Sequence, residues 1–314
     1  MNKLIRYWNQ NRVKIILVVA VIAFLIIVIQ LLNQVARDNN KANNTKKENV
    51  VEGLPTESII GGQTVSTEKT EVNVNEIESF IKKCNSGDIE GAYNMLTDEC
   101  KNVLFSSKLE NFKKGYYDII FSSKRTGDIE NFISGSNRYT YRVKFYNDLL
   151  STGSVQNMNS YQDYITIDEN STTDGKLNIN GFIYAKDINK ENSVGGVKVI
   201  VLSKQIYKDY EKIVVKFENT TNNRILIDTR TQSKTTYAVG SDGVKYSSNI
   251  SEISSALCEI PANFYRTYEI TIRKTYSSGV TTESIAFTDI VPNYEEYKQN
   301  TKEYKTRMKI SVSM

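Results

Sequence analysis

A long apolar segment near the amino terminus constrains this chain more than any other sequence feature. Residues 15–29 contain no polar side chain, and two leucines follow Gln30. Eighteen residues in a helix rise about 27 Å, which is close to the roughly 30 Å hydrocarbon core of a bilayer. We therefore expect residues 15–32 to form a single transmembrane helix. The segment is too long for the apolar part of a cleaved signal peptide, and residues 33–36 lack a small-residue cleavage pattern.

The net positive charge of the chain resides entirely before this segment. Four basic residues and no acidic residue precede it: Lys3, Arg6, Arg12 and Lys14. Basic residues also follow the segment, but Arg12 and Lys14 lie directly against its boundary, and long domains translocate largely regardless of their charge. We expect residues 1–14 to be cytoplasmic and the domains beyond the membrane to be extracytoplasmic. Residues 15–314 hold 36 basic and 36 acidic side chains, so no nucleic-acid binding is expected.

The chain contains no histidine, which excludes Ser-His and Cys-His catalysis and removes the commonest metal ligand. Residues 66–69 match the S-x-x-K form of serine transpeptidases, but no S-D-N or K-T-G element follows them. We predict a protein that is not an enzyme, with no catalytic residues, no cofactor and no metal. Cys84, Cys100 and Cys258 lack metal-binding spacing, and we expect buried free thiols, although a pair between Cys84 and Cys100 stays open.

Beyond the membrane segment, changes in composition and periodicity predict an α+β chain with helices first and strands afterwards. Capping boxes and apolar residues at helical spacing predict helices that begin near Asn75, Asp88 and Ser107. Alternating patterns predict strands from Tyr139 onward, and a glycine pair at 195–196 predicts an interdomain hinge. The predicted organisation is a cytoplasmic tail (1–14), a transmembrane helix (15–32), a flexible tether (33–73), an α+β domain (74–190), a β-sandwich (197–291) and a C-terminal tail (292–314).

The α+β domain resembles the nuclear-transport-factor-2-like superfamily. The similarity is carried by the stretch from Ile77 to Cys100, with Asn85-Ser86-Gly87-Asp88 and Ala92-Tyr93, and by strands 163–167 and 176–185. The resemblance implies a cone in which helices cover a curved sheet around a cavity. Alternation along the strands sends some of their aromatic residues inward, where we expect them to fill the cone with their hydroxyl groups at its rim or, as the alternative, to line a binding cavity. These residues are Tyr139, Tyr141, Tyr164, Phe182 and Tyr184.

Regular turn signals after residue 196 predict about seven short strands, as in a β-sandwich. This part resembles the immunoglobulin-like accessory domains of Gram-positive surface proteins. The layout of residues 1–190 is similar to the inner-membrane bridging component of type IV secretion and conjugation machines, although relatives in Gram-positive bacteria more often carry a second cone domain. The sequence thus predicts a non-catalytic membrane-anchored scaffold whose partners are the membrane and other envelope proteins. The alternative is a surface receptor that binds a small ligand or a cell-wall fragment in the cone.

Overall fold

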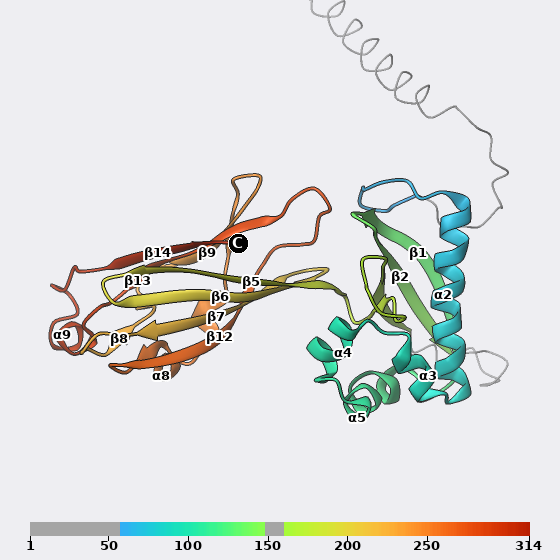
Figure 1. Cartoon of the computed structure of the whole chain (residues 1–314), viewed down its shortest axis with the longest axis horizontal. Helices are drawn as coiled ribbons and strands as arrows, with labels where there is room; N and C mark the ends of the chain where they lie inside the picture. Colours follow the sequence, from blue (N-terminus) through green and yellow to red (C-terminus); the bar gives the residue numbers. More distant parts are fainter. Residues whose placement is uncertain (1–56, 148–159) are drawn as a thin grey trace, which may run out of the picture. The chain divides into compact units, whose positions relative to one another are not determined.

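The computed structural model describes residues 57–147 and 160–314, and in these ranges the chain combines helices with antiparallel sheets (Figure 1). The predicted α+β class is confirmed at this level. The predicted cytoplasmic tail (1–14) and transmembrane helix (15–32) lie outside the described residues. None of the helices within the described ranges combines the length and the apolarity that crossing a bilayer requires.

The first part of the described chain is a layer of helices on a four-stranded sheet. The helices are α2 (Thr67–Ser86), α3 (Ile89–Asn94), α4 (Asp98–Phe105), α5 (Leu109–Phe112), the π-helical turn η1 (Lys113–Tyr117) and α6 (Asp118–Ile120). The sheet has the strand order β1-β2-β3-β4, with β1 (Arg125–Gly135), β2 (Arg138–Asn147), β3 (Tyr161–Asp168) and β4 (Leu177–Asn178). Figure 1 shows α2 running alongside β1. A continuous apolar core joins the helices to one face of this sheet.

Helix α2 begins at Thr67, earlier than the predicted start near Asn75. The Ser66 hydroxyl accepts a hydrogen bond from the Lys69 N–H at 3.3 Å, so the residues of the S-x-x-K match form a helix cap. Thr70 and Asn73 are buried on the same face of α2 as Phe80. The buried face of the helix therefore continues toward its amino terminus with polar residues. Apolar periodicity could not detect this turn because its inward-facing residues are polar.

The predicted tether (33–73) is therefore wrong in its last part. Besides the first turn of α2, the backbone before it lies along the edge of β1, where the Ile59 N–H donates to the Asn131 carbonyl at 3.1 Å. The Gln63 N–H donates to the Ser134 carbonyl at 2.9 Å. These bonds satisfy backbone groups that an edge strand would otherwise leave unpaired. Residues 33–56 of the predicted tether lie outside the described residues.

The chain leaves the first sheet at a turn that the sequence pattern conceals. Residues 177–184 alternate like one strand, but the structure divides them between β4 and β5 (Phe182–Val194). Asn180 and Gly181 both have positive φ, at 57° and 68°, and redirect the chain. Strand β4 pairs with β3, whereas β5 pairs with β6 (Val197–Tyr207) in another sheet. The predicted hinge is also wrong, because Gly195 and Gly196 form the tight turn of the β5–β6 hairpin.

The remaining strands form two four-stranded antiparallel sheets and a short pair. One sheet has the order β12-β7-β6-β5 and the other β10-β9-β13-β14, where β14 is Met308–Ser313, while β11 pairs with β8. The further elements are β7 (Glu211–Asn219), β8 (Ile225–Leu226), β9 (Thr236–Gly240), β10 (Lys245–Ser247), η3 (Ile250–Glu252), α8 (Ser255–Cys258), β11 (Glu259–Ile260), β12 (Phe264–Ile272) and β13 (Thr282–Ile290). Buried residues of both sheets share one core, among them Val199, Val215, Ile270, Ala238, Ile285 and Ile310. This core is distinct from the helix-on-sheet core.

The predicted C-terminal tail (292–314) contributes a strand to this second core. After the short helix α9 (Tyr294–Gln299), strand β14 (Met308–Ser313) pairs with β13. Ile310 and Val312 are each 1% exposed. Their alternation with Lys309 and Ser311 is a strand pattern, but it is too short to stand out after a lysine- and tyrosine-rich stretch.

The helix-on-sheet packing predicts that Phe80→Ala lowers the free energy of unfolding by about 3–5 kcal/mol. Phe80 is 0% exposed, and its ring lies 6.2 Å from that of Tyr116 and 6.4 Å from that of Phe121. Val72→Ala on the same helix is the control, because Val72 is 61% exposed and its truncation should change stability by no more than about 0.5 kcal/mol. Urea unfolding of the three proteins measures both values. Equal effects of the two substitutions would contradict this packing.

Candidate functional site

The structure brings some of the predicted cavity residues together inside the helix-on-sheet core. Tyr141 and Phe182 are each 0% exposed, and Tyr139 is partly buried on the same face of β2 as Tyr141. The Tyr141 hydroxyl accepts a hydrogen bond from the Asn73 side chain at 3.1 Å. Phe182 packs edge-on against Tyr207, with ring centroids 5.5 Å apart. These residues therefore contribute to a packed interior.

Tyr164 and Tyr184 lie elsewhere. Tyr164 is on the opposite face of β3 from the buried Ile165, and its ring centroid is 4.7 Å from that of Phe132. Tyr184 lies on β5 beneath the guanidinium of Arg138, whose Cζ is 4.0 Å from the ring centroid. The five predicted residues are thus divided between two faces of one sheet and a strand of another. Period-2 alternation identifies faces within a strand, but it does not say which element covers each face.

Aromatic rings fill the space between the helices and the sheet. Phe112 stacks on Tyr116 at a centroid distance of 5.8 Å and meets Phe105 edge-on at 5.4 Å. Phe121 meets Phe145 of β2 at 5.5 Å. All of these residues are at most 6% exposed. The helix-on-sheet interior is consequently occupied by the protein's own side chains.

One carboxylate lies within this interior. Asp163 on β3 is 4% exposed and accepts hydrogen bonds from the Tyr116 hydroxyl at 2.7 Å, from the Asn180 N–H at 3.0 Å and from the Tyr164 N–H at 2.6 Å. Burial raises the pKa of the Asp163 carboxyl above its ordinary value, and these hydrogen bonds oppose the rise. The oxygens of Asp163 therefore bond to the turn at Asn180 and to Tyr116 of the helical layer. These contacts stabilise the fold and leave Asp163 no role in binding a ligand.

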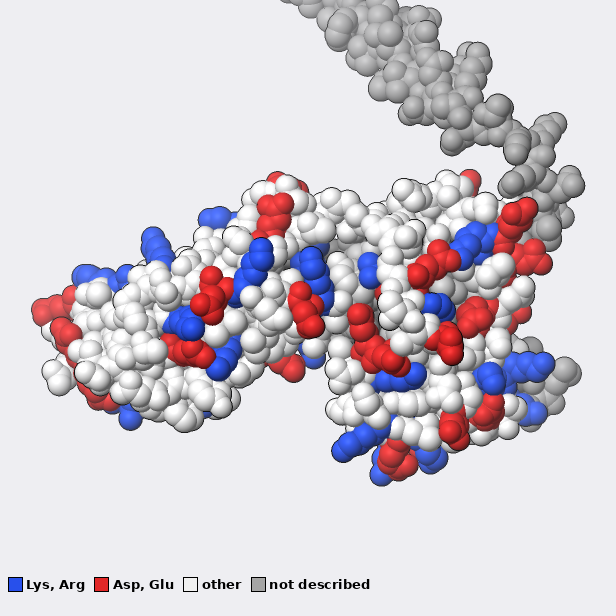
Figure 2. All heavy atoms as spheres, in the orientation of Figure 1, with Lys and Arg blue, Asp and Glu red and all other residues white. Residues whose placement is uncertain are grey.

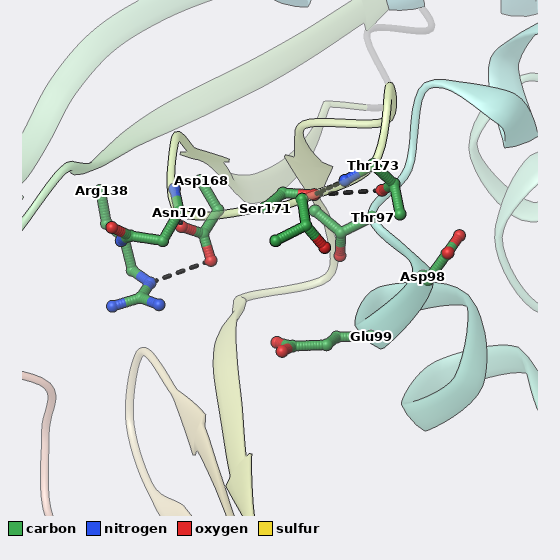
Figure 3. Close-up of a pocket in the computed structure, with 9 residues that line it drawn as sticks. Thr97, Asp98, Glu99, Arg138, Asp168, Asn170, Ser171 and Thr173 are labelled. Carbon is green, nitrogen blue, oxygen red and sulfur yellow. Dashed lines mark hydrogen bonds and ion pairs between the residues drawn. The ribbon is translucent and has the colours of Figure 1, made fainter.

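A polar pocket of about 150 Å³ lies at the edge of the first sheet (Figure 3). It is lined by residues from the start of α4, the start of β2 and the end of β3 with the loop that follows: Thr97, Asp98, Glu99, Arg138, Asp168, Asn170, Ser171, Thr172 and Thr173. We call it the α4 pocket. The Nε atom of Arg138 donates to Asp168 Oδ2 at 3.0 Å, which holds the guanidinium at the pocket (Figure 3).

The α4 pocket offers hydrogen bonds but no activated nucleophile. The Ser171 hydroxyl donates to the Gly175 carbonyl at 2.8 Å, and the Thr97 side chain caps α4 by accepting from the Cys100 N–H at 3.0 Å. Glu99 accepts from the Ala185 N–H at 3.2 Å. A hydroxyl becomes a nucleophile when a neighbouring base accepts its proton, and Ser171 donates instead to a backbone carbonyl. The arrangement suits recognition of a small polar ligand.

The three cysteines are buried and free. Burial raises the pKa of the Cys84 thiol to about 12, with Asp88 adding to the rise, and burial likewise raises the pKa of Cys100 to about 12. The Cys258 pKa is also raised by burial. Thiols in this state carry little thiolate and react slowly. Across residues 57–147 and 160–314, no group of three or more acidic or cysteine side chains is placed to hold a metal ion.

Charges of both signs are interspersed over the face of the molecule seen in Figure 2. The two neighbouring lysines of η1 are both paired, Lys113 with Asp118 at 3.3 Å and Lys114 with Glu110 at 3.0 Å. Pairing of this kind leaves no continuous positive strip on that face for a phosphate backbone.

The contacts of Asp163 predict the effect of Asp163→Asn. An amide presents an N–H to one of the donors that now bond the carboxylate, so the free energy of unfolding should fall by about 1–3 kcal/mol. Because the native pKa is raised, the stabilisation from Asp163 titration is complete below its unfolded pKa and is lost as the pH rises through the native pKa. The difference between wild type and variant should therefore be larger near pH ~4 than near pH ~7.

Urea unfolding at the two pH values measures this difference. Asp118→Asn is the matched control, since Asp118 lies at the surface with 46% of its side chain exposed and should change stability by at most about 0.5 kcal/mol. A difference that grows toward neutral pH would contradict the assigned direction of the Asp163 shift.

A comparison with known protein families finds no match, and no curated protein matches the sequence. Among solved structures, the chain is similar to a crystal structure of a conserved hypothetical protein from Bacillus anthracis, with 12% identity and a TM-score of 0.24. The alignment covers 39% of this chain and 94% of that one. A similarity at this TM-score supports no inference about fold or function.

Proposed function

We propose that this protein is a non-catalytic, membrane-anchored scaffold of an extracytoplasmic assembly. The observation that carries the proposal is the filled interior between helices and sheet, where Tyr141, Phe112 and Phe182 are each 0% exposed. An enzyme or a receptor that binds its ligand inside the cone needs an open cavity there, whereas a scaffold needs a stable body with an outer surface. The absence of histidine and the inert state of the thiols support the same function.

Within this proposal, the helix-on-sheet part is a cone of the nuclear-transport-factor-2-like type and the two later sheets form an immunoglobulin-like sandwich. Support comes from the order of the elements and from the single core that the two sheets share. The apolar segment 15–32 anchors the chain in the cell membrane of a Gram-positive bacterium, with residues 1–14 in the cytoplasm.

We further propose that the assembly is a conjugation or type IV secretion machine. The supporting feature is the combination of a short basic tail, one apolar segment and a helix-on-sheet domain. The second core, built from β-strands, departs from the double-cone layout of Gram-positive relatives and gives this chain an additional surface for envelope proteins.

The alternative function is a surface receptor for a small ligand or a cell-wall fragment. The α4 pocket favours it, because side chains with hydroxyl groups, carboxylates and the guanidinium of Arg138 line it (Figure 3). Thr172 lines this pocket with an exposed side chain, so Thr172→Arg should obstruct it without disturbing the core.

Native electrophoresis of detergent-solubilised membranes distinguishes the two functions. A scaffold should migrate in a complex larger than the purified chain, and Thr172→Arg should leave that complex intact. Gln232→Arg, an exposed change away from the pocket, is the control. Migration of the wild-type chain as a single copy would contradict the scaffold. Loss of the complex in Thr172→Arg but not in Gln232→Arg would favour the receptor.

Cysteine labelling tests the proposed topology. Glu90→Cys places an exposed thiol on α3, while the native cysteines are buried and should remain silent. On intact cells with a permeabilised wall, a membrane-impermeant maleimide should label Glu90→Cys but not Asn2→Cys, which should react only after lysis. The reverse pattern would invert the proposed orientation.

A further inference from the structure

A buried ion pair lies in the second part of the chain, where β7 meets the segment after β12. Lys274 Nζ is 2.8 Å from Glu211 Oε1, and the two side chains are 3% and 2% exposed. The Thr282 hydroxyl donates to Glu211 Oε2 at 2.5 Å, and Lys274 also donates to the Val280 carbonyl at 2.9 Å. Glu211 is thus neutralised by one lysine and bonded through both of its oxygens.

A second lysine, Lys204 of β6, lies close to this pair without a carboxylate of its own. The residue is 5% exposed, and its Nζ donates to the Thr282 carbonyl at 3.0 Å. Among the described residues, no carboxylate lies within ion-pair distance of Lys204. Burial lowers the pKa of Lys204, and the more distant Glu211 only partly opposes this effect. Two of its three N–H donors are left for another acceptor.

Arg138 is a third cation beside Lys274 and Lys204. Its Nε atom is bonded to Asp168 and its guanidinium lies over the Tyr184 ring, so its orientation is fixed from two sides. Within the described ranges, its terminal nitrogens have no hydrogen-bond acceptor. A guanidinium held in this way presents paired donors in the geometry that carboxylate and phosphate groups accept.

These groups line one cavity of about 60 Å³. The charged residues of its lining are Arg138, Lys204, Lys274 and Glu211. Lys274 is paired with Glu211 and Arg138 with Asp168, so among the described residues Lys204 is the lining cation without a carboxylate partner. Five serine and threonine residues also line the cavity, and one of them, Thr282, already donates its hydroxyl to Glu211. An uncompensated cation at a buried site is costly, and the cost falls when a counter-ion binds. The volume is suitable for a few water molecules or for a single small anionic group.

We propose that this cavity is a binding site for a small oxyanion, a phosphate or carboxylate group held between Arg138 and Lys204. The guanidinium supplies paired donors, the Lys204 ammonium supplies point charge, and the hydroxyl groups complete the coordination. Lys274 remains with Glu211 and keeps that carboxylate from repelling the ligand. The α4 pocket shares Arg138 with this site but contains Asp98, Glu99 and Asp168, so its charge does not favour an anion.

Isothermal titration calorimetry of the full-length chain in detergent micelles and low-chloride buffer tests the proposal. Inorganic phosphate, sulfate and acetate are the probes. Binding of phosphate or sulfate alone identifies a tetrahedral anion, and binding of acetate identifies a carboxylate; either result supports the site. Lys204→Met removes the charge while keeping the length of the side chain, and it should weaken binding about tenfold or more.

Lys212→Gln is the matched control, because Lys212 on β7 pairs with Glu269 at 3.5 Å outside the cavity and should keep wild-type affinity within about twofold. Arg138→Gln provides a second test that remains valid if Lys204→Met fails to fold, and circular dichroism establishes folding of each variant. Absence of heat with all three anions would overturn the proposal. So would wild-type affinity in a folded Lys204→Met or Arg138→Gln protein.

Discussion

A single buried carboxylate joins the helices to the point where the chain passes from its first sheet to its second. Asp163 accepts the Tyr116 hydroxyl and the Asn180 N–H on the same oxygen, so the helical layer, β3 and the turn after β4 are fixed together. Asn180 and Gly181 can then hold their positive φ angles, and β5 pairs with β6. Both cores depend on this junction, since Phe182 begins β5 yet packs in the first core.

The buried polar side chains differ in how many of their hydrogen-bonding groups have a partner within the chain. A side chain whose groups are all bonded stabilises the fold, whereas one with unused donors can bind a ligand. Asp163 and Glu211 have hydrogen bonds on their oxygens from groups of the chain itself. Lys204 and Arg138 retain donors that the described residues do not use. A packed first core is therefore compatible with the proposed anion site, because the two involve different side chains, although Arg138 and the core residue Tyr141 both belong to β2.

The sequence predicted a helix start correctly at Asp88, whose side chain accepts from the Gly91 N–H at 2.9 Å. The caps predicted at Asn75 and Ser107 are wrong, because Asn75 lies inside α2 and Lys108 precedes α5 without a side-chain cap. The sequence failed where inward-facing residues are polar, as at Thr70 and Asn73 of α2. It also failed at residues 177–184, where regular alternation continues through a change of sheet. Alternation reports which side of the backbone a residue occupies, and it carries no information about the strand that pairs with it.

The order of helices before strands, the lack of histidine chemistry and the apolar segment at 15–32 follow from the sequence alone, because each depends on composition or on neighbours along the chain. The cluster of Arg138, Lys204, Glu211 and Lys274 does not, and only the tertiary structure brings it together. These residues come from four separate segments, and none has a motif around it. Their meeting depends on strand register and on the turn at Asn180, which long-range hydrogen bonds decide.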